Sequence, residues 1–178
     1  LGEIGAYNFT HGTGAAGSRF LLSRRLAEAG VRYITVTFGS WDMHDGVEAG
    51  IKRWQPEFDK AYAALIRDLD DRGMLDETLV VVTSEFGRTP KINRTAGRDH
   101  WPKLFGAALA GGGIKQGSVY GKPDMTASEP EENPVSPADL SATLYHLMGI
   151  DPEKTLLTPD QRPIGIVKDG KILSDIMG

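Results

Sequence analysis

The sequence contains no cysteine among its 178 residues. This absence excludes disulfides, thiolate nucleophiles and cysteine-ligated zinc, so any bound metal must be held by histidine, aspartate or glutamate. It does not identify the cellular compartment, because exported proteins can also lack cysteine.

Long apolar runs and an excess of one charge are also missing. No stretch approaches the roughly 18 consecutive apolar residues of a membrane-spanning helix. The formal net charge is -4, with acidic and basic residues interspersed, which gives no basis for a nucleic-acid or anionic-membrane partner. We therefore expect a small-molecule or protein partner and no membrane span.

The start of the chain has neither an initiator methionine nor a targeting segment, since it reads Leu1-Gly2-Glu3-Ile4. This start predicts a fragment or a processed product, with part of the working site upstream. Residues 1–178 are long enough for a single domain with a hydrophobic core.

Two successive units of helix, strand and polar loop predict an α/β fold. A helix is expected at Ser18–Ala29, followed by a β-branched strand at Val31–Phe38. A longer helix is expected at Glu48–Arg72, followed by a second strand at Leu79–Thr83. This order predicts a layered sheet with flanking helices, with both loops at one edge.

The second half of the chain carries weaker strand signals and one strong helix signal. Leu104–Ala110 is expected to form a third strand, and Ser118–Tyr120 a short fourth. Ser136-Pro137-Ala138-Asp139 predicts a capping box that opens a helix ending at Met148.

The polar loops after the first two strands carry residues that bind metals. Asp42 and His44 follow the first strand, and His100 lies in a loop beyond the second. If both loops share one edge of a sheet, two imidazoles and a carboxylate meet, which is a common donor set for zinc and non-haem iron. Such a metal would polarise an ester oxygen or lower the pKa of bound water. Asp42 and His44 alone fit a solvated loop equally well.

Glu85 and Arg88 follow the second strand directly. Glu85 is predicted to be a further ligand, a group that orients an imidazole, or a general base. Arg88 fits a planar oxyanion such as sulfate or phosphate, because its fork matches two oxygens at once. The alternative is a structural ion pair between Glu85 and Arg88. Asp99 is a ligand, a hydrogen-bond partner of His100 or a turn residue.

A glycine-rich segment supports a competing hypothesis. Gly12–Gly17 fits the G-x-G-x-x-G pattern of dinucleotide sites and precedes a helix, and Asp42 could then bind a ribose. No buried strand leads into the first glycine, however, so a tight entry to the helix explains the pattern more simply. His11 and His146 lack a comparable context.

Several segments, in order, resemble an uncharacterised bacterial family, domain-of-unknown-function family 1501. The resemblance covers nearly the whole chain, and its most specific parts are Ser-Glu-Phe-Gly-Arg-Thr-Pro and Gly-Arg-Asp-His. That family is similar to the alkaline phosphatase and sulfatase superfamily. The matching segments are Leu22–Val31, Trp41–His44, Leu69–Leu79, Ser84–Pro90, Gly97–His100 and Ala110–Ile114.

The resemblance implies an exported, periplasmic hydrolase of sulfate or phosphate esters, acting on small molecules or saccharides. Asp42, His44 and His100 resemble the ligands of one divalent ion, with zinc expected first and calcium, manganese or iron as alternatives. A second metal usually takes an Asp-His pair, which Glu85 and Phe86 replace here. The resemblance also implies that the nucleophile lies in an upstream half, so this chain alone is not expected to be a competent enzyme. A catalytically inactive binding protein of the same fold is the alternative.

Overall fold

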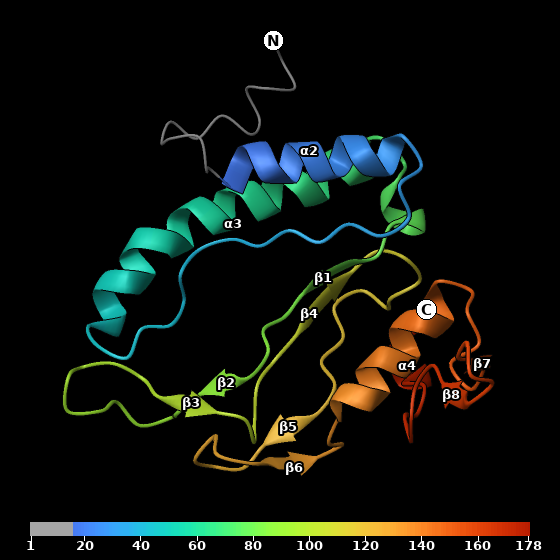
Figure 1. Cartoon of the computed structure of the whole chain (residues 1–178). Coiled ribbons are helices and arrows are strands. Elements are labelled where there is room, and N and C mark those ends of the chain that lie inside the picture. Colours follow the sequence, from blue (N-terminus) through green and yellow to red (C-terminus); the bar gives the residue numbers. More distant parts are fainter. Residues whose placement is uncertain (1–15) are drawn as a thin grey trace.

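The computed structural model describes residues 16–178, which contain three α-helices, two 3-10 helices and eight short strands (Figure 1). The helices are α2 (Ala16–Glu28), α3 (Val47–Asp71), α4 (Pro137–Leu147), η1 (Leu75–Glu77) and η2 (Ser174–Ile176). The strands are β1 (Val80–Val82), β2 (Gly87–Arg88), β3 (His100–Trp101), β4 (Ala108–Ala110), β5 (Lys122–Pro123), β6 (Pro130–Glu132), β7 (Thr155–Leu157) and β8 (Pro163–Gly165). Within residues 16–178, no helix combines the length and apolar composition needed to cross a bilayer.

Helices α2 and α3 pack against each other and form the main hydrophobic core (Figure 1). Arg24 is also buried there, and its Nε donates a hydrogen bond to Asp68 at 2.8 Å. Val36, Phe38 and Val80 pack against this core, so the helix pair fixes the segments that lead into both candidate loops. The buried apolar residues of the core are Ala16, Phe20, Leu21, Ala61, Leu65 and Leu69.

The predicted helices are confirmed, because each matches an observed helix with ends within two residues of the expected ones. Pro56 lies inside α3. Gly30 and Gly73 follow α2 and α3 with φ angles of 87° and 66°. This left-handed conformation is the usual reason for glycine at a helix end.

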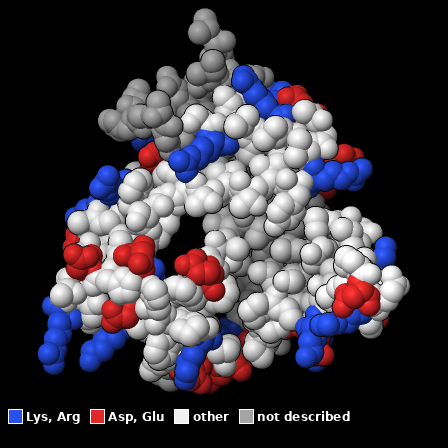
Figure 2. All heavy atoms as spheres, viewed as in Figure 1, with Lys and Arg blue, Asp and Glu red and all other residues white. Residues whose placement is uncertain are grey.

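The predicted strand at Val31–Phe38 is wrong, since these residues form an extended segment without strand pairing (Figure 1). Even-numbered residues from Ile34 to Phe38 are partly buried and odd-numbered ones exposed, so the side chains alternate as in a strand. Figure 2 shows an opening between this segment and β1. A ladder needs a neighbour at about 4.8 Å, and none of the described residues supplies one.

The second and third predicted strands are confirmed in shorter form as β1 and β4. They pair antiparallel, with Val80 opposite Ala110 and Val82 opposite Ala108. The weak strand expected at Ser118–Tyr120 is not formed. The other pairs, β2 with β3, β5 with β6 and β7 with β8, are also two-stranded and antiparallel. Residues 16–178 therefore combine helices with small antiparallel sheets, and the layered sheet expected from the sequence is not seen among them.

The capping box at the start of α4 is confirmed. The Ser136 side chain accepts a hydrogen bond from the Asp139 N–H at 3.1 Å, and Asp139 Oδ2 accepts one from the Ser136 N–H at 2.8 Å. Pro137 occupies the first turn, where a missing N–H costs nothing. Hydrogen bonds from the Ser136 side chain and backbone and from the Lys171 N–H lower the pKa of Asp139. Folding therefore favours the carboxylate form that the cap needs.

Removing this cap should destabilise the protein without affecting the candidate loops. Ser136→Ala leaves a helix N–H without its acceptor, and we expect the free energy of unfolding at pH 7 to fall by about 1 kcal/mol. Ser136→Thr keeps a hydroxyl and should lose only a few tenths of a kcal/mol. Urea unfolding followed by circular dichroism compares the two. Equal losses in both variants would mean that the cap hydrogen bond contributes nothing.

Candidate metal centre

A tight loop between Phe38 and α3 presents Asp42 and His44. Trp41 Nε1 donates a hydrogen bond to the Phe38 carbonyl at 2.9 Å, which folds the loop back on the core. The His44 N–H donates a hydrogen bond to the Asp42 carbonyl at 3.2 Å, so Asp42 and His44 lie on one tight turn of the backbone. Gly46, with a φ of 51°, then turns the chain into α3.

A second loop, residues 93–98, holds the first in place, and we name it the clamp loop. Asn93 Nδ2 and Thr95 Oγ1 both donate to the His44 carbonyl, at 2.9 and 2.8 Å. The Gly46 N–H donates to the Thr95 carbonyl, and the Arg98 N–H donates to the Met43 carbonyl, both at 3.0 Å. The backbone around His44 is therefore fixed by residues about fifty positions away in sequence.

Gly97 lets the clamp loop approach this closely. The residue is buried, and a Cβ added to it would lie 2.0 Å from both the carbonyl carbon and the oxygen of His44. Since real Cβ atoms do not tolerate such a distance to backbone, only glycine fits without a shift of one loop.

The hairpin of β2 and β3 positions the side chains of Arg88 and His100. Arg88 and His100 are direct cross-strand partners. Residues directly opposite each other in an antiparallel pair project to the same face. Both side chains therefore reach the same carboxylate, that of Asp42.

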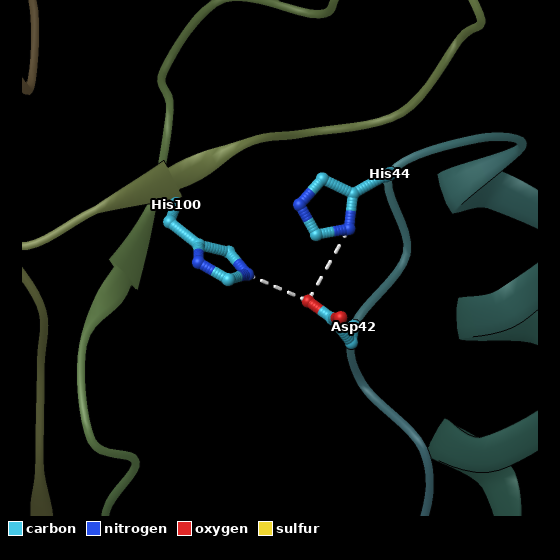
Figure 3. Close-up of side chains that lie close together, drawn as sticks. All are labelled: Asp42, His44 and His100. Atoms are coloured by element: carbon cyan, nitrogen blue, oxygen red, sulfur yellow. Dashed lines mark hydrogen bonds and ion pairs between the residues drawn. The ribbon is translucent and has the colours of Figure 1, made fainter.

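The structure brings together Asp42, His44 and His100, which we name the Asp/His cluster (Figure 3). Asp42 Oδ1 lies 2.8 Å from His100 Nε2 and 3.3 Å from His44 Nδ1. One ligand atom from each of the three residues lies within 4.8 Å of the others. Arg88 Nη2 contacts the same Asp42 oxygen at 2.6 Å.

The surroundings keep Asp42 ionised. Hydrogen bonds from His100 and Arg88 lower the pKa of Asp42 from its ordinary value of 3.8 to about 2, with a smaller contribution from the charge of His44. The side chain is 61% exposed, so water also solvates the charge. Asp42 therefore presents a carboxylate throughout the neutral pH range.

The donor set of the cluster fits a divalent ion. Two imidazole nitrogens and one carboxylate oxygen match zinc and iron sites that keep an open position for water or substrate. Ligand atoms about 2 Å from one ion lie no more than about 4 Å apart, so small side-chain rotations would close the site. The His44 and His100 side chains are 45% and 47% exposed, which leaves one side open to solvent.

Glu85 is exposed, and among residues 16–178 no hydrogen bond or ion pair joins it to the cluster. The alternative ion pair between Glu85 and Arg88 is wrong, because Arg88 pairs with Asp42 instead. Asp99 accepts a hydrogen bond from Asn93 Nδ2 at 3.0 Å and so supports the clamp loop.

Two supporting contacts were not identified from the sequence. Asn93 holds the clamp loop together, since its Oδ1 accepts hydrogen bonds from the Thr95 and Gly97 N–H groups. This role of Asn93 could have been predicted, because an asparagine side chain commonly hydrogen-bonds to the backbone two residues further along the chain. The Phe86 ring lies against His100, with ring centroids 4.3 Å apart. Phe86 precedes β2 and His100 begins β3, and a contact between positions so far apart in the chain has no sequence signature.

Among the described residues, the other candidates from the sequence are not part of the Asp/His cluster. His11 and the first part of the glycine pattern, residues 12–15, lie outside the described residues. Gly17 lies within α2 and is buried in the core. His146 is exposed on α4, beside Gly149 and Ile150.

Comparison with known proteins identifies a family for this chain. No curated protein and no solved structure matches the chain. The family described as "Protein of unknown function (DUF1501)" matches residues 3–177. The match spans nearly the whole sequence, including every residue of the Asp/His cluster. The chain therefore belongs to the DUF1501 family.

Proposed function

We propose that the protein is a metal-dependent hydrolase of sulfate or phosphate esters, in which Asp42, His44 and His100 hold one divalent ion. The observation that carries this proposal is the convergence of their three ligand atoms within 4.8 Å, from loops far apart in sequence. Zinc is the first choice, because the donor set has two imidazoles and one carboxylate. Calcium, manganese and iron are the alternatives.

The polar groups around the cluster favour an anionic ester. A divalent ion in this position would polarise an ester oxygen or lower the pKa of bound water. Arg88 stands beside it with a planar fork that matches two oxygens of a sulfate or phosphate group. Glu85 remains a predicted supporting or basic group, on the loop that enters β2.

The relation to alkaline phosphatases and sulfatases is part of the same proposal, as are export to the periplasm and a small-molecule or saccharide substrate. These statements rest on the segment resemblance described above. The loops that lead out of Phe38 and β1 would then lie at the active edge of that fold.

One observation favours a second candidate, a catalytically inactive binding protein of the same fold. Phe86 stands where the resemblance places a histidine ligand of a second metal, and a phenyl ring has no ligand atom to offer a metal ion. Its ring packs on His100 instead. A single ion would then serve structure or recognition rather than two-metal catalysis.

Metal removal tests the proposal and separates the two candidates. The protein should purify with about one zinc per chain, and a chelator should remove it. Adding zinc to 100 times its Kd should then raise the free energy of unfolding by about 2.7 kcal/mol. Elemental analysis and denaturant unfolding measure these effects.

A hydrolysis assay with aryl sulfate and aryl phosphate esters is carried out on the full-length natural protein. Turnover that disappears with the chelator and returns with zinc supports the hydrolase. Bound metal without turnover of either ester supports the inactive binding protein. A protein that purifies without metal and shows no change on adding zinc contradicts both.

A further inference from the structure

We propose that Arg88 competes with the bound metal for Asp42, so that metal binding releases the Arg88 guanidinium to receive the substrate oxyanion. This inference rests on the proposed metal site. It adds a coupling between metal binding and anion binding. The metal and the anion each strengthen the binding of the other through Arg88.

The competition follows from charge, because the metal and the guanidinium would both lie at one oxygen atom of Asp42. Asp42 Oδ1 takes the contacts with Arg88 Nη2 at 2.6 Å, His100 Nε2 at 2.8 Å and His44 Nδ1 at 3.3 Å. A carboxylate oxygen offers about two lone-pair sites. A metal held jointly by both imidazoles and this oxygen takes one of those sites and places a double positive charge beside the guanidinium. Repulsion between the two cations then favours departure of Arg88.

Arg88 has contacts besides the one with Asp42: its Nη1 donates a hydrogen bond to the Arg98 carbonyl at 3.5 Å, and its side chain is 25% exposed. The backbone is held in β2 by pairing with β3. The guanidinium carbon lies 5.7 Å from the centre of the Phe86 ring, a cation–π contact that does not involve Asp42. Phe86 in turn packs on His100. These contacts would keep an arginine that leaves Asp42 next to the metal.

A released guanidinium changes what the site recognises. While paired with Asp42, Arg88 has part of its fork occupied by a carboxylate of the protein itself. Once free, it offers paired N–H donors to two oxygens of a sulfate or phosphate group. By thermodynamic linkage, the factor by which zinc strengthens anion binding equals the factor by which the anion strengthens zinc binding.

Calorimetric titration of zinc into the metal-free protein tests the competition. Arg88→Met removes the competing cation, and we expect zinc to bind roughly tenfold tighter than to the wild type. Arg162→Met is the matched control, because it removes the same charge from a side chain that is 75% exposed and pairs with Asp160 at 3.6 Å. Its zinc affinity should stay within about twofold of wild type.

Titration of inorganic phosphate and sulfate tests the release. Zinc should raise the affinity of the wild type for these anions about tenfold or more, within the usual range of coupling energies. In Arg88→Met the gain should shrink to the part that the metal supplies by itself. Thermal unfolding checks that the variant is folded, and Arg88→Gln repeats the test with a neutral polar side chain.

The outcomes separate this inference from the proposed function. Unchanged or weaker zinc binding by both neutral variants overturns the competition, while normal zinc binding by the wild type leaves the metal site standing. An equal anion gain in wild type and Arg88→Met overturns the release. Failure of the wild type to bind zinc overturns both proposals together.

Discussion

Asp42→Asn is expected to weaken zinc binding at least about 100-fold, more than the loss typical of residues that only orient a ligand. The substitution keeps the shape of the side chain and removes its charge. Asp42 is the only anion of the Asp/His cluster, and the lowered pKa of about 2 shows how strongly its surroundings favour the carboxylate. An amide cannot neutralise a divalent ion. Competition with a zinc-binding dye measures the loss, and circular dichroism checks the fold.

Asp45→Asn is the matched control for this variant. Asp45 lies in the same loop, is exposed, and joins the clamp loop through its backbone bridge to Ala96 rather than through its side chain. It removes the same charge three residues away, so its zinc affinity should stay within a few-fold of wild type. Comparable losses in Asp42→Asn and Asp45→Asn would show that general charge, rather than coordination, attracts the ion.

The helices could be read from the sequence because their signals are local. Apolar positions at three- and four-residue spacing, a capping box at Ser136 and glycines at helix ends each depend on residues within one or two turns. The strand at Val31–Phe38 could not be settled in this way. Its side chains alternate as expected, but a strand also needs a partner, and partners are set by long-range contacts.

The members of the candidate site could be predicted from the sequence, but the contacts that hold them together could not. Asp42, His44 and His100 stood out because ligand-type residues in loops beyond predicted strands tend to meet. Arg88 was assigned to an oxyanion or to a structural ion pair. The structure places it on Asp42, a residue that sequence spacing could not indicate. The clamp loop depends on backbone contacts over some fifty residues, for which no periodic pattern exists.

Gly97→Ala is expected to damage both the stability of the protein and its metal affinity. The new Cβ would lie 2.0 Å from the His44 carbonyl group, which already accepts hydrogen bonds from Asn93 and Thr95. Because the neighbour is backbone, the clash is relieved only by moving one loop. We expect the free energy of unfolding to fall by about 1–3 kcal/mol, as in other overpacked sites. Zinc affinity should fall roughly 10- to 100-fold, as when groups that orient a ligand are lost.

Gly106→Ala is the control for this last variant, because an added Cβ there meets no atom within 4 Å. It should leave zinc affinity unchanged and the free energy of unfolding nearly so. Denaturant unfolding and zinc titration of both variants give four values that separate the roles of the clamp loop. If Gly97→Ala loses stability but binds zinc normally, the loop supports the fold without orienting His44. If it loses neither, the loops separate at little cost, and the close approach at Gly97 does not position the site.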